Sequence, residues 1–176
     1  MPFILGLIGL ATAAYFMVIR ARRGAEMASE LMDVASDVRA AARRFGFRRK
    51  QNIHPVDSID DPKLALGALS AAFMALDDLP TQDGRTALDA QLRKHLELDS
   101  QQAQEIAVLG QWFVETCGGA DAAVKRLSKR LYALDKGQSF GVLMAVIQGT
   151  IHSTGHPLST RQSEALVDIK RAFHLS

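Results

Sequence analysis

Residues 64–98, "LALGALSAAFMALDDLPTQDGRTALDAQLRKHLEL", contain two apolar stripes separated by a polar break. The first stripe comprises Leu64, Leu66, Leu69, Phe73 and Leu76, and the second comprises Leu88, Leu92, Leu96 and Leu98. Apolar residues that recur every three or four positions form one face of an α-helix. The aspartates and the glycine between the stripes are typical of a turn. This stretch therefore predicts a helix, an acidic turn and a second helix.

The rest of the C-terminal region continues this pattern. Four more apolar stripes cover residues 106–113, 124–134, 142–151 and 166–173. Polar or glycine-containing breaks separate the stripes at Asp99-Ser100, Gly118-Gly119, Lys136-Gly137 and His156-Pro157. No long run alternates with the period of two that a half-buried strand requires. The sequence predicts an all-α domain, a compact bundle of about six helices over residues 63–176.

Two parts of this region resemble each other. "LGALSAAF" (66–73) matches "FGVLMAVI" (140–147), with glycine second, leucine fourth and alanine sixth in both. "ALDAQLRKHLEL" (87–98) resembles "ALVDIKRAFHL" (165–175) in its pattern. Such recurrence predicts a bundle built from two similar helical hairpins, joined by the helices around Trp112 and Leu127.

The N-terminal region, residues 1–23, has the features of a membrane anchor. Residues 3–19 carry no charge, and Arg20, Arg22 and Arg23 follow directly. A span needs about 20 residues, and a cleaved signal peptide would place its basic residues ahead of the apolar run. Positive flanks tend to stay cytoplasmic. We predict a single-pass transmembrane helix in the inner membrane, with the N-terminus outside and the following domain cytoplasmic. A buried core helix is the alternative.

Residues 24–50 predict a juxtamembrane amphipathic helix. Its apolar residues are spaced by four and three in turn, as in a heptad seam: Met27, Leu31, Val34, Val38, Ala41 and Phe45. The seam is compatible with a homodimer formed by the helix and the span together. It is equally compatible with a helix that folds back on its own domain. Residues 51–62, with Pro55 and Pro62 and no periodicity, predict a linker.

The juxtamembrane helix ends in a basic segment. Residues 20–50 hold nine Lys or Arg against four Asp or Glu, and "RRFGFRRK" (43–50) combines two phenylalanines with Arg43, Arg44, Arg48, Arg49 and Lys50. Contact with anionic lipid is one interpretation and a solvated linker is the other; nucleic acid is not an expected partner. A straight helix would place Arg43 roughly 35 Å from the membrane, beyond the Debye length of about 8 Å. Lipid contact therefore requires the helix to lie along the membrane.

Motifs for catalysis are missing from the sequence. There is no G-x-S-x-G elbow, no phosphate-binding glycine loop and no CxxC pair. His152 and His156 have the spacing of a helical metal pair, but Gly155 and Pro157 interrupt the helix. Cys117 has no nearby histidine and is more typical of a buried or unreactive thiol. We expect no enzymatic activity, no cofactor and no metal ligands among these residues.

The helix–acidic turn–helix layout, its recurrence near the C-terminus and the closing "RAFHLS" (171–176) resemble the TerB-like domain of tellurite-resistance proteins, over roughly residues 60–176. Together with the N-terminal span, the layout is similar to the front part of membrane-anchored DnaJ-like proteins of the DjlA type. The resemblance implies a cytoplasmic helical domain linked to envelope stress or to protein assemblies at the membrane. The "HPVD" at 54–57 does not match a J-domain, because it lies in the predicted linker rather than between two helices.

The resemblance also implies that acids in the turn can hold a divalent cation. Asp77, Asp78 and Asp83 are the candidates, but Thr154 and Gln162 occupy the corresponding positions of the second copy. The alternative is that these turns only cap helices, with a capping box from Ser159 to Gln162. We predict a membrane-anchored protein-interaction module for recruitment or scaffolding, with an unidentified protein partner. The alternative is a divalent-metal-binding stress or tellurite-resistance protein.

Overall fold

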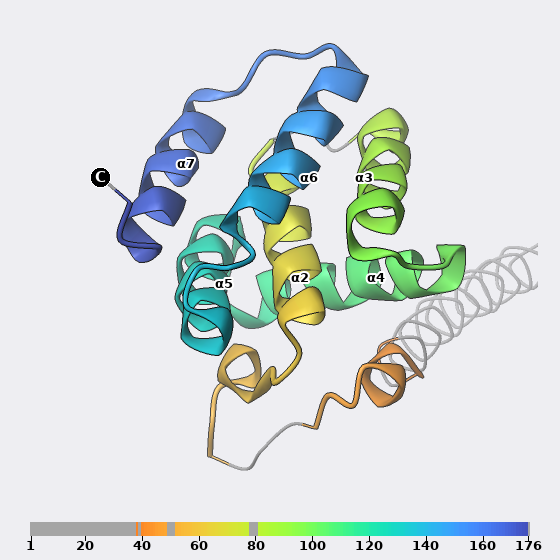
Figure 1. Ribbon diagram of the computed structural model, residues 1–176, viewed down its shortest axis with the longest axis vertical. Coiled ribbons are helices and arrows are strands. Elements are labelled where there is room, and N and C mark those ends of the chain that lie inside the picture. The colour runs from red at the N-terminus through yellow and green to blue at the C-terminus, as the bar shows by residue number, and fades with distance from the viewer. Residues whose placement is uncertain (1–37, 39, 49–51, 78–80, 176) are drawn as a thin grey trace, which may run out of the picture. The chain divides into compact units, whose positions relative to one another are not determined.

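The structure, a computed structural model, describes residues 38, 40–48, 52–77 and 81–175 (Figure 1). In this part the regular structure is helical throughout: η1 (Pro55–Ser58), α2 (Pro62–Met74), α3 (Gln82–Leu96), α4 (Ser100–Thr116), α5 (Ala120–Asp135), α6 (Phe140–Thr154) and α7 (Thr160–Ala172). The prediction of an all-α bundle with six helices is confirmed. None of the helices described is long and apolar enough to cross a bilayer. The predicted span, residues 3–19, lies outside the described residues.

The predicted breaks become helix ends with defined caps. The Thr81 hydroxyl accepts a hydrogen bond from the Gly84 amide at 3.1 Å at the start of α3. Ser159 begins α7 with the predicted capping box, in which its hydroxyl and the Gln162 side chain each bond the other's backbone amide. Asp99 begins α4 with a second capping box. These bonds satisfy amides that a helix start otherwise leaves unpaired.

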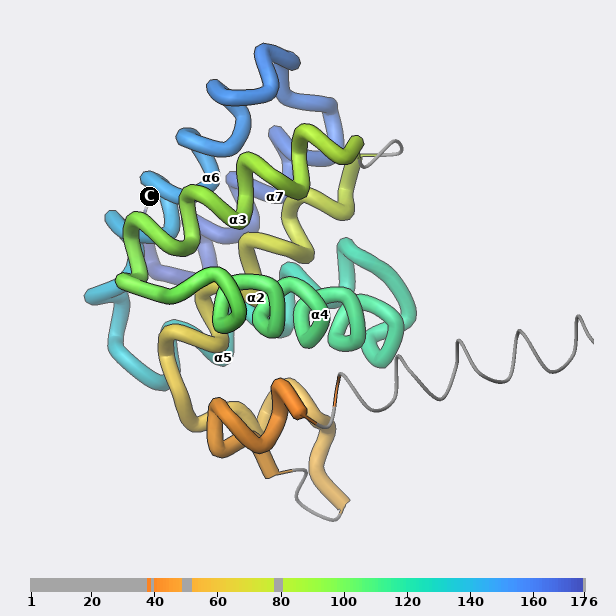
Figure 2. Tube along the Cα trace, turned by 90° about the vertical axis from the view of Figure 1, so that its right-hand side faces the viewer, coloured from red at the N-terminus to blue at the C-terminus, as the bar shows by residue number. Residues whose placement is uncertain are grey.

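Helix α2 lies at the centre of the bundle. Nine of its residues are buried. They include the polar Ser70 and also Gly67, which has no side chain. A helix that is apolar all round must be surrounded by protein, and α2 packs mainly against α4 and α5. Helix α3 packs against α6, and α7 packs against α5 (Figures 1 and 2).

Of the two predicted helical hairpins, α2 and α3 contact each other, but α6 and α7 do not pack as a pair. The main neighbour of α6 is α3 rather than α7, and the connection from α6 to α7 carries α7 away to α5 (Figure 1). Gly149 of α6 faces the side chain of Gln91 on α3, whose Oε1 would lie 2.5 Å from a Cβ at position 149. The repeated residue pattern reflects helices of similar amphipathicity, and amphipathicity does not specify which helix fills the apolar face.

The crossing of α2 and α4 depends on two glycines. A Cβ on Gly110 would lie 2.6 Å from the Cβ of Ala71, and one on Gly67 would collide with Cγ2 of Ile106. Contacts this short do not occur between real side chains. The two helix backbones therefore approach more closely here than any larger residue would allow.

The predicted linker, residues 51–62, contributes to the core. Val56 and Ile59 are completely buried. Asp57 forms a bidentate ion pair with Arg126 on α5, with Arg126 Nε 3.2 Å from Oδ1 of Asp57. Arg130, one turn further along α5, donates from Nε to the carbonyl of Ile59 at 2.6 Å. The compact unit extends from Val38 to Ser176, so it begins well before the predicted boundary at residue 63.

The Asp57–Arg126 pair should make stability depend on acid pH. Hydrogen bonds from the guanidinium lower the pKa of Asp57, so its contribution is present above the unfolded pKa of about 4 and is lost as the pH falls through the folded value. Both side chains are about two-fifths exposed. We therefore expect Asp57→Asn to lower the unfolding free energy by only about 0.5–1 kcal/mol at pH 7. Urea unfolding at pH 7 and pH 3 should show this difference shrinking in acid. In an Arg126→Gln background, the same substitution should have little effect at either pH.

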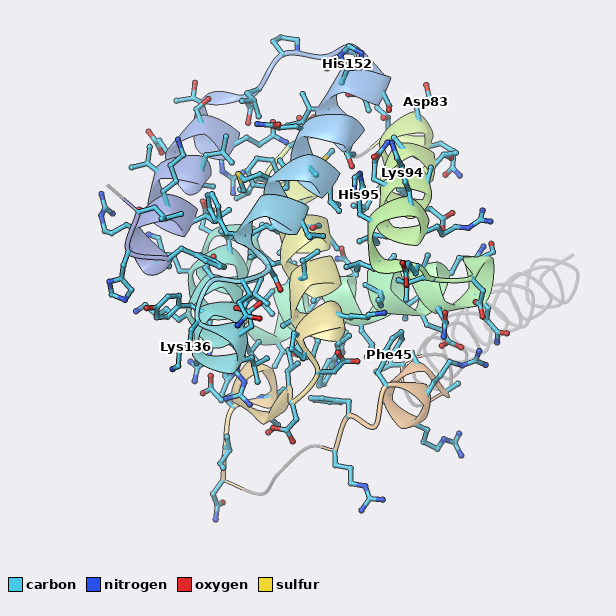
Figure 3. The ribbon with its side chains drawn as sticks, viewed as in Figure 1. Phe45, Asp83, Lys94, His95, Lys136 and His152 are labelled. Carbon is cyan, nitrogen blue, oxygen red and sulfur yellow. The ribbon has the colours of Figure 1, made fainter. Side chains whose placement is uncertain are left out.

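The described end of the helix predicted over residues 24–50 packs on the bundle. Ala41 is fully buried, and Phe45 is partly buried against the core (Figure 3). The ring of Phe47 meets Trp112 and Phe113 edge-on, at centroid distances of 5.9 and 5.5 Å. The last positions of the heptad seam therefore pack on the chain's own domain, as expected for a helix that folds back. The earlier positions, Met27 to Val34, lie outside the described residues.

Packing of the two phenylalanines also changes the interpretation of the basic segment. Their rings contact the protein core and do not interleave with the arginines on an open surface. Arg44 Nε lies 3.0 Å from Oε2 of Glu105 on α4, while Arg43 and Arg48 are exposed. Arg49 and Lys50 lie outside the described residues. Lipid contact by this segment remains a prediction and would involve the arginines without their aromatic neighbours.

Candidate functional site: a groove where the two polar turns meet

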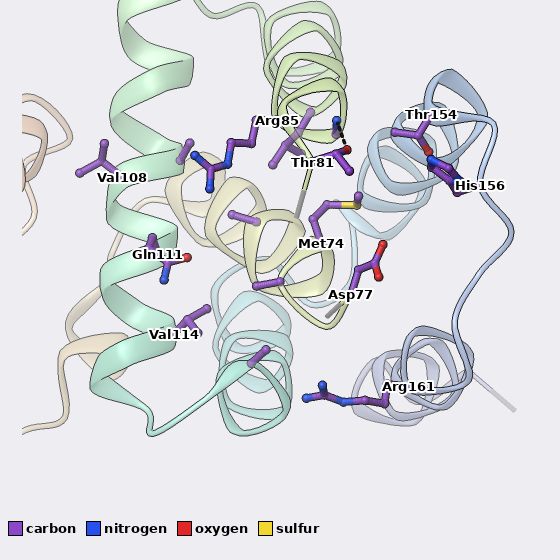
Figure 4. Close-up of a pocket in the computed structure, with 16 residues that line it drawn as sticks. Met74, Asp77, Thr81, Arg85, Val108, Gln111, Val114, Thr154, His156 and Arg161 are labelled. Carbon is purple, nitrogen blue, oxygen red and sulfur yellow. Dashed lines mark hydrogen bonds between the residues drawn. The ribbon is translucent and has the colours of Figure 1, made fainter. Parts of the chain in front are cut away.

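One end of the bundle carries a groove of about 770 Å³ (Figure 4). It is lined by the C-terminal ends of α2 and α6, the start of α3, and parts of α4, α5 and α7. The turn after α2 and the turn after α6 therefore face one cavity, although more than 70 residues separate them in sequence. Cavities of this size commonly hold ligands or side chains of a partner.

The floor of the groove is apolar and composed mainly of small side chains. Ala71, Met74 and Ala75 of α2 form its centre, with Val114 of α4 and Ala120 of α5 beside them. Val114 and Ala120 are less than a tenth exposed. Because the side chains of the floor are short, they leave space in the groove. The flexible thioether of Met74 adapts to different apolar shapes.

Polar groups form the rim. Figure 4 shows Arg85 of α3 and Gln111 of α4 on one side, and His156 and Arg161 on the other, with Asp77 between them. Nη2 of Arg161 lies 2.6 Å from Oδ2 of Asp121 on α5. Arg85 is exposed, and its guanidinium has no hydrogen-bond or ion-pair partner in the part of the chain that the structure describes. The rim therefore contains a cation that is available to a ligand.

The acidic turn does not form a metal cage in the described part of the chain. Asp77 lines the groove, whereas Asp83 is exposed at the start of α3 (Figure 3). Thr81 caps α3, as described above. Over residues 38, 40–48, 52–77 and 81–175, no three His, Cys, Asp or Glu side chains come together as a metal site. Asp78 lies outside those residues.

The two histidines do not share a helix face. His152 is exposed in the last turn of α6, and Gly155 ends that helix with a left-handed φ of 66°. His156 follows the helix end and lies on the groove rim. The interruption predicted from Gly155 and Pro157 is confirmed.

Cys117 lies away from the groove, at the end of α4. Its side chain is partly buried, and burial raises the pKa of the thiol. A thiol nucleophile requires the opposite shift, because the thiolate is the reactive form. The environment of Cys117 is thus that of an unactivated thiol.

Sequence reasoning missed the rim residues Arg85, Gln111 and Arg161. Each is one polar residue on the solvent side of a different helix, and only the pairing of α3 with α6 and of α7 with α5 places them around one cavity. The polar turns themselves are the detectable signal, because each interrupts the apolar pattern of the sequence.

The chain matches no family model, no curated protein and no solved structure.

Proposed function

We propose that the protein is a membrane-anchored recruitment module whose groove holds an amphipathic segment of a partner protein. Residues 3–19 would anchor it in the inner membrane, with residues 38–176 in the cytoplasm. The observation that carries the proposal is the groove itself: an apolar floor of small side chains with a polar rim, at the end of the bundle where both turns meet.

The side chains around the groove favour binding over chemistry. Thr81, whose hydroxyl lies on the edge of the groove, is engaged in capping α3. An apolar floor flanked by polar groups is the usual environment for the apolar face of a bound helix. The partner segment would place its apolar side chains against Met74 and Ala75.

Charge complementarity defines one side of this segment. Because the guanidinium of Arg85 has no partner among the described residues, a carboxylate of the partner would gain an ion pair there without disrupting another. On the opposite side, the pair Arg161–Asp121 offers groups of both signs, and Asp77 adds a carboxylate between the two sides. The segment that fits is amphipathic, with an acidic residue at the Arg85 edge.

Photo-crosslinking in intact membranes tests the groove. A benzophenone amino acid at Ala107, which lines the groove, should give a discrete adduct with one partner protein. The same group at Val167, which is 54% exposed on α7 and outside the groove, should not. Arg85→Glu should reduce the Ala107 adduct about tenfold or more, because it replaces an ion pair by a repulsion. Arg93→Glu on the same helix, outside the groove, should leave the adduct unchanged.

Identical adducts from positions 107 and 167, or an adduct insensitive to Arg85→Glu, would exclude the groove as the binding site.

The divalent-metal alternative makes a separate prediction. Calorimetric titration with calcium, magnesium and zinc should give no binding heat if recruitment is the function. The anchor is tested by alkaline extraction, which should leave the full-length chain in the membrane pellet.

The TerB-like resemblance and a role in envelope stress belong to this proposal as well. Both rest on the layout of helix, acidic turn and helix in the sequence and on its recurrence near the C-terminus. The recruitment proposal is also compatible with dimerisation through the span and the first heptads. It is compatible as well with lipid contact by Arg43 and Arg48.

A further inference from the structure

A second cavity, of about 380 Å³, lies between the 54–57 segment and α5, on residues that the recruitment groove does not use. We propose that this basic cavity binds a phosphate group, carried either by a lipid headgroup or by a soluble phosphate compound. Its lining consists of His54, Asp57, Cys117, Ala122, Lys125, Arg126 and Lys129.

The charges of the lining favour an anion. Three cationic side chains, Lys125, Arg126 and Lys129, face one carboxylate, Asp57. Arg126 and Asp57 neutralise each other in their bidentate pair. The two lysines therefore supply the excess charge, and they lie one helical turn apart on the same face of α5, where like charges repel. An anion between them would remove that repulsion.

The two lysines differ in how far they are already paired. Nζ of Lys125 lies 3.5 Å from Oδ2 of Asp168, whose other oxygen accepts a hydrogen bond from Arg171 at 2.7 Å. Lys129 has no ion-pair partner in the described part of the chain and is exposed. Lys129 is thus the main group available to an incoming anion, and Lys125 can share its charge between Asp168 and the ligand.

His54 adds a ring N–H group to the lining of the cavity. Its Nδ1 accepts a hydrogen bond from the Val56 amide at 3.3 Å. The neutral ring must then carry its proton on Nε2, the remaining nitrogen. An N–H donor together with two ammonium groups matches the acceptor-only oxygens of a phosphate. The cavity is large enough for a phosphate with part of the group that carries it.

Cys117 allows a direct test, because it lines the cavity and is the only cysteine of the chain. The rate at which neutral iodoacetamide alkylates Cys117 should fall when inorganic phosphate occupies the cavity. The full-length chain in non-ionic detergent would be labelled with and without phosphate, with sodium chloride at equal ionic strength as the reference. Each variant is compared with its own rate without phosphate, so that a change in intrinsic thiol reactivity cancels.

Lys129→Gln should raise the phosphate concentration needed for half-maximal protection about tenfold, and Lys125→Gln should also raise it. Lys94→Gln, on the exposed face of α3 and outside the cavity, should have no effect (Figure 3). Protection equal to that given by sodium chloride, or protection that survives both α5 substitutions, would overturn the proposal.

Labelling in nanodiscs separates the two sources of phosphate. Protection by phosphatidic acid discs that exceeds protection by phosphatidylcholine discs, and is lost in Lys129→Gln, would identify a lipid headgroup. Protection by free phosphate alone would identify a soluble ligand. Failure of the crosslinking experiment at the groove would leave this result unaffected, since the two cavities share no residue.

Discussion

Replacing Ile59 by alanine should lower the free energy of unfolding by about 2–5 kcal/mol. The Ile59 side chain is completely buried. The backbone carbonyl of the same residue accepts a hydrogen bond from Arg130, which holds this segment to α5. This anchoring limits how far the surroundings can collapse into the space that the lost methyl groups leave. Urea unfolding followed by circular dichroism would measure the change.

Ile53 provides a matched control within the same predicted linker. It is 45% exposed, so Ile53→Ala should change the free energy by less than about 0.5 kcal/mol. If the two substitutions had equally small effects, the segment would be a linker, as its prolines and lack of periodicity predict. A large difference would place the segment in the core of the domain.

The glycines at the α2–α4 crossing should behave contrary to helix propensity. Alanine normally stabilises a helix by about 1 kcal/mol relative to glycine. Gly67→Ala and Gly110→Ala should instead destabilise the protein by about 1–3 kcal/mol each, since the added methyl group would overlap Ile106 or Ala71. The relief of this overlap requires the two central helices to separate.

Gly141 gives the opposite expectation. It lies in the first turn of α6, and a Cβ there would meet no atom within 4 Å. Gly141→Ala should therefore leave stability unchanged or raise it by up to about 1 kcal/mol. Thermal unfolding of the three variants side by side tests the sign. A stabilising effect at position 67 or 110 would contradict the close crossing.

The helices and their breaks could be predicted because the relevant signals are local. The spacing of Leu88, Leu92 and Leu96 identifies a helix face without knowledge of its partner, and Ser159 with Gln162 identifies a helix start. Pairing of the helices could not be predicted. It depends on where backbones can approach, as at Gly110 opposite Ala71, and one glycine in a helical pattern does not reveal what packs against it.

Local sequence patterns also could not predict that the 55–59 segment lies in the core. A short 3-10 helix has no periodicity to detect, and its burial depends on Arg126 and Arg130, about 70 residues further along the chain. The two polar turns beside the groove could be predicted from the sequence, but their meeting in one groove could not. Its rim needed the tertiary pairing that places Arg85 opposite Arg161.

Packing of Phe47 against Trp112 has a practical consequence. The chain contains one tryptophan, and that indole is only partly buried, with the Phe47 ring covering it edge-on. Detachment of the 40–48 segment would hydrate the indole and shift its emission to longer wavelength. Intrinsic fluorescence of the unlabelled protein would then report, in real time, whether the 40–48 segment is docked on the domain or released.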